Sequence, residues 1–154
     1  LGDRQLARID PHITLVPPIN IADADMADAL AVVDTAARSH PPFRLALGPL
    51  TTFGPGSPVR FLAVTPAAPV HDAATACRRG PFDRPLDRPF VPHVTVDIDG
   101  GPTDGGDDPA AGLLRHYRVE VAIDRLTVLE QVVDGDGRRW EPYLAYRCHG
   151  GAAP

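Results

Sequence analysis

Several short stretches of the chain alternate between apolar and polar residues, which is the pattern of strands that bury one face. The stretches predicted as strands are residues 11–16, 43–50, 59–65, 92–96, 118–133 and 139–148. Residues 52–58 are rich in the turn formers Gly, Pro and Ser, and residues 134–137 read Asp-Gly-Asp-Gly, a strong hairpin signal. We therefore predict one hairpin over residues 43–65 and a long one over residues 118–148.

Two other stretches place apolar residues three or four positions apart, the spacing of one face of a helix. The first follows two prolines, takes Asn20 or Asp23 as its cap and ends at about Ala37. The second is rich in alanine and runs from Pro69 to about Arg79. A third, short helix is predicted over residues 109–117.

One short motif occurs twice in the predicted strands. Residues 11–15 read Pro-His-Ile-Thr-Leu and residues 92–96 read Pro-His-Val-Thr-Val. In an extended strand the His and Thr of each copy share one face, and the apolar residues share the other, where burial would fix the register. Pro11 and Pro92 suit the first position of a strand because proline has no amide hydrogen to donate to a sheet.

The candidate catalytic residues are therefore His12, Thr14, His93 and Thr95. A single His-x-Thr strand is more often structural, since one donor and one acceptor satisfy a neutral imidazole, but the matched second copy reverses that judgement. Two imidazoles and two hydroxyls suit acid–base chemistry at phosphorus, provided that the two strands lie side by side.

Composition narrows the classes of function. The chain has 154 residues, of which 44% are hydrophobic and 23% charged, as in one ordinary soluble domain. Its net charge of −5 argues against sequence-blind binding of long nucleic acid, which needs a basic face. All 15 basic residues are arginine, which is typical of a GC-rich genome. The sequence contains no apolar run of membrane-spanning length, secretory signal, Gly-rich phosphate loop, His-Glu-x-x-His or Gly-x-Ser-x-Gly.

Neither the acidic stretch nor the cysteines indicate a metal site. Residues 97–108 resemble a calcium loop in composition, but the Gly is doubled and no Glu closes the pattern, so we predict an acidic loop without metal. Cys77 and Cys148 lack metal-ligand spacing. We expect two free thiols in a reducing cytoplasm, and a disulfide between them stays open.

The two motifs resemble those of the two-histidine (2H) phosphoesterase superfamily, which has one His-x-Thr/Ser-x motif in each half of a single domain. The stretches Pro-His-Ile-Thr-Leu-Val-Pro-Pro and Pro-Pro-Phe-Arg-Leu-Ala-Leu-Gly-Pro-Leu-Thr-Thr-Phe-Gly resemble its bacterial branch of 2′-5′ RNA ligase-like proteins, or RNA 2′,3′-cyclic phosphodiesterases. The 81-residue separation of His12 and His93 also suits that branch. The resemblance implies an α+β fold of two pseudo-symmetric lobes, each mainly antiparallel sheet backed by helices, with both motifs in a central cleft.

The resemblance also implies an activity. One of His12 and His93 would act as general base and the other as general acid in the metal-independent hydrolysis of a 2′,3′-cyclic phosphate, while Thr14 and Thr95 hold the phosphate. Reversible 2′-5′ RNA ligase activity is expected beside it, with no cofactor and no metal. The alternative is a non-catalytic module that binds a nucleotide or RNA end in the same cleft.

The expected partners follow from that activity. They are a nucleotide or an RNA terminus that bears a cyclic phosphate or a 2′-5′ linkage, and neither a membrane nor long duplex nucleic acid. We expect a cytoplasmic monomer. Family members begin with a strand and a helix before the first motif, whereas eleven residues precede His12 here. Residues 1–154 are therefore expected to form a single two-lobed domain that lacks this N-terminal portion.

Three further residues are candidates for substrate contacts. Phe53 lies in the turn-rich stretch, Arg88 lies in a loop over residues 78–90 that carries four arginines, and Tyr143 lies in the last predicted strand. An arginine in such a loop could grip phosphate oxygens, although it is more often simply solvated. Tyr143 could stack on a base, although a place in the core or on a sheet surface is commoner.

Overall fold

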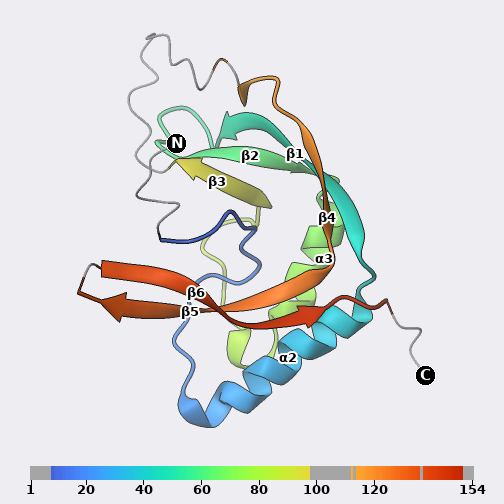
Figure 1. The fold of residues 1–154 in the computed structure, drawn as a ribbon, viewed down its shortest axis with the longest axis vertical. Helices are drawn as coiled ribbons and strands as arrows, with labels where there is room; N and C mark the ends of the chain where they lie inside the picture. The colour runs from blue at the N-terminus through green and yellow to red at the C-terminus, as the bar shows by residue number, and fades with distance from the viewer. Residues whose placement is uncertain (1–7, 98–111, 113, 136, 151–154) are drawn as a thin grey trace.

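The alternating stretches form two sheets in the structure, a computed structural model that describes residues 8–97, 112, 114–135 and 137–150 (Figure 1). The described elements are, in chain order, the 3-10 turn η1 (Asp23–Asp25), α2 (Met26–Ser39), β1 (Phe43–Thr52), β2 (Arg60–Thr65), α3 (Ala68–Cys77), the 3-10 turn η2 (Gly80–Phe82), β3 (His93–Asp97), β4 (Val119–Ile123), β5 (Arg125–Asp134) and β6 (Gly137–Arg147). The described strands make an antiparallel sheet of order β3-β2-β1-β4 and a separate β5–β6 ribbon.

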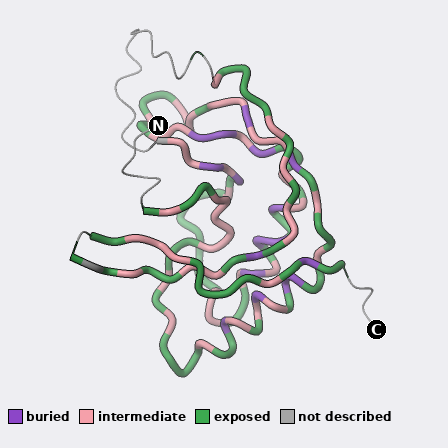
Figure 2. Tube along the Cα trace, in the orientation of Figure 1, coloured by how far each residue is buried: buried purple, intermediate pink, exposed green. Residues whose placement is uncertain are grey.

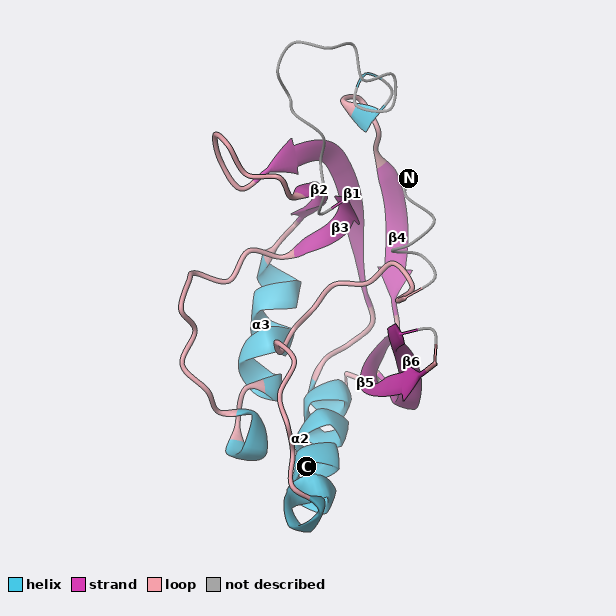
Figure 3. Cartoon of the chain, turned by 90° about the vertical axis from the view of Figure 1, so that its left-hand side faces the viewer, coloured by secondary structure: helices cyan, strands magenta, loops and turns pink. Residues whose placement is uncertain are grey.

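The four-stranded sheet is built around β1. This strand pairs with β2 from Ala46↔Thr65 to Thr52↔Arg60, which confirms the predicted first hairpin. Its apolar face carries Leu45, which packs with Val64 of β2 and Val70 of α3. Helix α3 therefore covers one face of the sheet, and Figure 3 shows it beside the curled strands.

Helix α2 forms the second layer of the core. Its buried residues are Ala29, Val33, Ala36 and Ala37, which repeat at the predicted spacing of three or four. Val33, Ala36 and Ala37 pack with Cys77 at the end of α3 and with Leu126 of β5. The helix was predicted to start at Asn20 or Asp23, but it begins at Met26, after the turn η1. Figure 2 shows buried positions along α2, along α3 and in the strands of the four-stranded sheet.

The prediction of one long strand over residues 118–133 is wrong. The chain breaks at Asp124 into β4, which pairs with β1, and β5, which pairs with β6. The apolar positions change phase there, from the odd-numbered Val119–Ile123 to the even-numbered Leu126 and Val128. A strand cannot bury both sets on one face, so the chain leaves one sheet and enters the other. The predicted turn is confirmed, since Asp134 pairs with Gly137.

One glycine brings β1 against the start of β4. Gly48 lies where the β1–β2 register shifts and has a φ of +108°. A Cβ atom at this position would overlap the carbonyl oxygen of Tyr117. The close approach therefore depends on the absence of a side chain at position 48.

Two predictions lie largely outside the described residues, namely the acidic loop over residues 97–108 and the short helix over residues 109–117. Within the part of the chain that is described, no helix combines the length and apolar character needed to span a membrane.

Candidate active site

The second motif lies in β3, which confirms the predicted strand. His93 stands opposite Ala63 of β2, and Thr95 stands opposite Phe61. His93 and Thr95 therefore share one face of the sheet. Val94 faces the other way and is only 7% exposed, so its burial sets the register that aims the two polar side chains.

The first motif is not part of a strand, so the strand predicted over residues 11–16 is wrong. The segment bends at Pro11 and again at residues 15–16, and the described chain gives it no continuous ladder partner. It is attached to β6 just before the motif, where the Trp140 N–H donates to the Arg8 carbonyl at 2.7 Å. The predicted sidedness nevertheless holds, because Ile13 and Leu15 pack against the core around Leu45.

The two motifs come from distant parts of the sequence to neighbouring positions. Residues 8–16 run between β3 and the β5–β6 ribbon in two perpendicular views (Figure 1 and Figure 3). Leu15 packs against both hydrophobic clusters, the one under α2 and the one under α3. All four candidate side chains, on His12, Thr14, His93 and Thr95, are half-buried.

Both histidines make the same local hydrogen bond. The Nδ1 atom of His12 lies 2.7 Å from the carbonyl oxygen of Asp10, and that of His93 lies 2.7 Å from the carbonyl oxygen of Val91. A carbonyl can only accept, so Nδ1 must carry the proton in each ring. When the ring is neutral, Nε2 is then the basic nitrogen. Both neutral imidazoles therefore have the same tautomer, with the proton on Nδ1.

Two aromatic rings surround the imidazole of His93. The Phe53 ring meets it edge-on, with centroids 5.0 Å apart, and the Phe61 centroid lies at 5.1 Å. The two phenyl rings are 4.4 Å apart. Phe61 is buried at 5% exposure, whereas Phe53 is 49% exposed and presents an open ring beside the histidine.

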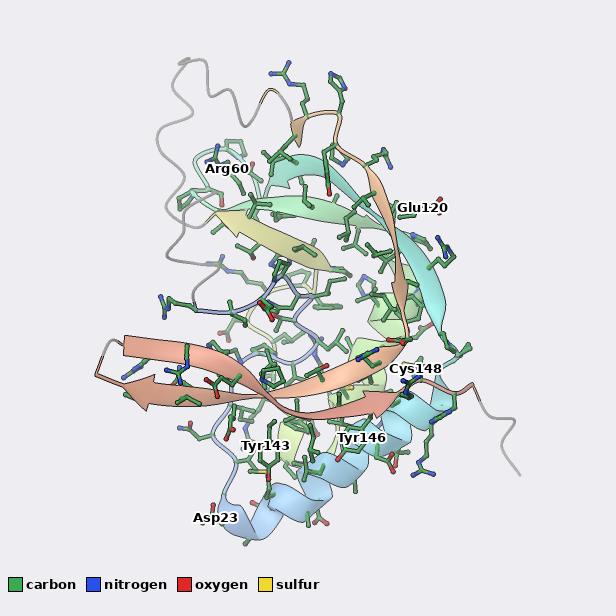
Figure 4. All side chains as sticks on the ribbon, in the orientation of Figure 1. Asp23, Arg60, Glu120, Tyr143, Tyr146 and Cys148 are labelled. Atoms are coloured by element: carbon green, nitrogen blue, oxygen red, sulfur yellow. The ribbon has the colours of Figure 1, made fainter. Side chains whose placement is uncertain are left out.

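The other two candidates for substrate contacts are not drawn toward the histidines by any described interaction. Arg88 is exposed in the loop before β3. Tyr143 is 47% exposed, and Figure 4 shows it on the α2 side of the β5–β6 ribbon. The contacts of the site therefore favour Phe53 over Arg88 and Tyr143 as a neighbour of bound substrate.

Sequence reasoning missed two residues that contact the motifs. The alternation in residues 59–65 placed Phe61 on one face of a strand, but whether that face meets His93 depends on the β2–β3 register, which the sequence does not give. Arg78 left no signal of this kind. Its Nε–H donates to the carbonyl of Leu15 at 3.0 Å, and its guanidinium carbon lies 4.4 Å from the ring centroid of Phe90. Burial lowers the pKa of Arg78 from its usual value.

The thiols and carboxylates do not assemble a metal centre in the described residues. Nowhere in that part of the chain do three or more His, Cys, Asp or Glu side chains form a group that could hold an ion. Cys77 and Cys148 are both free and pack in one apolar cluster. Burial raises the pKa of Cys77 to about 11, so this thiol stays protonated near neutral pH.

Comparison with known proteins points to one family. The profile of the 2′-5′ RNA ligase superfamily matches residues 1–135. An Oceanobacillus iheyensis protein is 24% identical over 144 residues, which cover 94% of this chain and 83% of that protein. A Bacillus cereus protein is 28% identical over 147 residues, with 94% and 83% covered. Both are named as putative phosphoesterases.

Solved structures share the fold at low sequence identity. Escherichia coli LigT complexed with 3′-AMP superposes with a TM-score of 0.70 at 17% identity, over 90% of this chain and 76% of that one. TT0787 of Thermus thermophilus gives a TM-score of 0.66 at 19% identity, over 92% and 80%. Other LigT structures that resemble this chain contain ATP or NADP+.

Proposed function

Because the chain belongs to the 2′-5′ RNA ligase superfamily, we propose that it is a metal-independent phosphodiesterase that hydrolyses 2′,3′-cyclic phosphates with His12 and His93 as acid and base. The observation that carries this proposal is the pair of matched Nδ1 hydrogen bonds, each 2.7 Å long. They leave each ring with Nε2 available for proton transfer, which is what a two-histidine mechanism requires.

In the proposed reaction, one imidazole takes a proton from water while the water oxygen forms a bond to phosphorus. The bond from phosphorus to the 2′ or 3′ oxygen breaks, and the other imidazole, as imidazolium, gives its proton to that oxygen. Thr14 and Thr95 donate hydrogen bonds to the non-bridging oxygens, where negative charge grows in the transition state. The expected 2′-5′ RNA ligase activity uses an RNA hydroxyl in place of water.

Phe53 is the substrate-binding residue that the contacts favour. Its ring is 49% exposed and touches the His93 ring, so a nucleobase stacked on it would lie next to the reacting phosphate. The substrate class proposed is an RNA end or a small nucleotide with a cyclic phosphate. A cytoplasmic monomer with two pseudo-symmetric lobes in a single domain belongs to the same proposal.

The test is incubation of the protein with each 2′,3′-cyclic mononucleotide in EDTA, followed by chromatography that separates the 2′- and 3′-monophosphates. We expect a single monophosphate isomer, whose identity shows which oxygen leaves. Replacing either histidine by alanine should lower turnover by roughly 10² to 10⁴-fold, the usual contribution of one general acid or base. The double variant should lose far less than the product of the single effects.

His93→Asn is the matched variant. An asparagine amide can still donate to the Val91 carbonyl, as the His93 Nδ1–H does at 2.7 Å, but it offers no basic nitrogen at the Nε2 position. It should therefore keep the fold and lose turnover as alanine does. If His93→Asn stays near wild-type activity on a substrate that the protein turns over, two-histidine catalysis is wrong.

The second candidate is a nucleotide-binding module without turnover. Its support is that the similar LigT structures contain nucleotides as different as 3′-AMP, ATP and NADP+. Calorimetric titration with the same cyclic nucleotides separates the two candidates. Tight binding with no monophosphate product would favour the binding module and would overturn the phosphodiesterase proposal.

A further inference from the structure

The first histidine motif needs an anchor other than a sheet. The second motif lies within β3 and is fixed by the ladder to β2, from Arg60↔Asp97 to Ala63↔His93. Residues 11–16 do not form a strand. In the proposed reaction, however, His12 must be held in a precise position relative to His93. Misplacement of a catalytic group by about 1 Å can cost about 10²-fold in rate, so the anchor of this segment matters.

Arg78 contacts the chain shortly after the first motif histidine and shortly before the second. It is the first residue after α3, and its own N–H is held by the Ala74 carbonyl at 3.0 Å. Its Nε–H donates at 3.0 Å to the carbonyl of Leu15, three residues after His12. Its guanidinium carbon lies 4.4 Å from the ring centroid of Phe90, three residues before His93.

We propose that Arg78 is a positioning residue that ties the two histidine motifs together, with its Nε–H on the Leu15 carbonyl and its guanidinium on the Phe90 ring. The activity that it supports is the one proposed above, on which this inference rests. Arg78 does not touch the reacting atoms. It acts by fixing the segments that carry His12 and His93.

Both residues that Arg78 contacts are held by further packing contacts. The side chain of Leu15 packs against both hydrophobic clusters, so its backbone lies at the junction of the two cores. The Phe90 ring is held from a second direction by His71 of α3, whose ring meets it edge-on at 5.1 Å. Helix α3 and its C-cap residue therefore support the two motif segments, through the side chain of Arg78 and the ring of His71.

An arginine can make these two contacts at once, and a lysine cannot. The planar guanidinium stacks on an aromatic ring while its Nε–H donates in the plane of the group. A lysine ammonium is a compact charge that can satisfy the carbonyl or lie over the ring, but not both in this geometry. Arg78→Lys is thus expected to restore only part of what Arg78→Ala loses.

The neighbouring arginine provides the control. Arg79 is exposed and lines an open groove with Thr35 of α2 and Asp72 of α3, and no residue of either motif lines that groove. Arg79→Ala removes the same charge from the next position in the chain. It should leave turnover within about twofold of the wild type, as expected for an exposed charge.

The experiment measures kcat and KM on a 2′,3′-cyclic mononucleotide, together with the folded fraction by circular dichroism. Arg78→Ala should lower kcat about 10- to 100-fold for folded protein, with KM changed less than about threefold, because alignment rather than binding is lost. Arg78→Lys should fall between that variant and the wild type. Equal kcat in folded Arg78→Ala and Arg79→Ala would overturn the proposal.

A readout without turnover keeps this inference separate from the proposed function. If the wild type hydrolyses no cyclic nucleotide, the proposed function fails, and the ring nitrogen signals of His12 and His93 in ¹⁵N NMR spectra still test Arg78. Arg78→Ala should shift the signals of both rings, and Arg79→Ala should shift neither. If Arg78→Ala does not fold, Arg78→Lys should show the same shifts in part. Unchanged signals in a folded Arg78 variant would refute the role.

Discussion

Replacing Gly48 by alanine should destabilise the four-stranded sheet more than any ordinary surface substitution. The φ of +108° at this position is one that alanine adopts at a cost of about 1–2 kcal/mol. The new Cβ would also overlap the Tyr117 carbonyl oxygen, which belongs to backbone and can give way only if the start of β4 moves. A further loss of about 2 kcal/mol is a reasonable size for such a displacement.

The matched control is Gly56→Ala. Gly56 has a φ of +78°, but nothing lies within 4 Å of the position that its Cβ would take. Gly56→Ala should therefore cost only the conformational part, about 1–2 kcal/mol, against about 3–4 kcal/mol for Gly48→Ala. For a chain of 154 residues, 1 kcal/mol corresponds to about 2–4 °C in Tm. Urea denaturation and calorimetry measure both variants, and equal losses in the two would refute the argument from the close approach of β1 and β4.

Two further predictions concern the site and the core. Phe53→Ala should lower kcat/KM by about 5- to 150-fold, because stacking of one base is worth about 1–3 kcal/mol. The Tm of this variant should change little, since the ring is 49% exposed. Tyr143→Ala, assayed beside it, should leave kcat/KM unchanged. Burial raises the pKa of Cys77 from about 9 to about 11, so the folded state keeps a proton that the unfolded state loses. The contribution of this thiol to the free energy of unfolding is therefore fully present below about pH 9. It falls by about 2–3 kcal/mol as the pH rises to 11. Urea titrations across this range should show the fall in the wild type and a flatter curve in Cys77→Ala, and parallel curves would contradict the assignment.

Local patterns were sufficient to predict most helices and hairpins. The apolar spacing of α2 and the turn formers after β1 are read within a few residues. The hairpin appears where it was expected, and α2 appears with its start moved from Asn20 or Asp23 to Met26. The boundary at Asp124 could also have been predicted, because the apolar positions change from odd to even numbers there. The change is easily overlooked when residues 118–133 are treated as one stretch, and it becomes visible when the alternation before and after Asp124 is compared.

Relations between distant segments could not be predicted in the same way. Residues 11–16 have the alternation of a strand, but a strand also needs a neighbour along its whole length. The described chain pairs no strand with them, and the backbone–backbone hydrogen bond to β6 lies before them, at Arg8. The sequence predicted which side chains of each motif share a face, but it did not predict the residues that contact the two motifs. The contact of Phe61 with His93 depends on strand register, and that of Arg78 with Leu15 spans 63 positions.

The atoms that accept the Nδ1 hydrogen bonds of His12 and His93 are backbone carbonyl oxygens and not carboxylates. A carboxylate in the same position would hold the ring equally well, but it would repel an anionic phosphodiester a few ångströms away. The carbonyl offers a dipole only, so the proposed site can remain attractive to phosphate although the whole chain carries a net charge of −5. In the proposed reaction, the orientation of His12 and His93 and the attraction of the phosphate therefore depend on different groups.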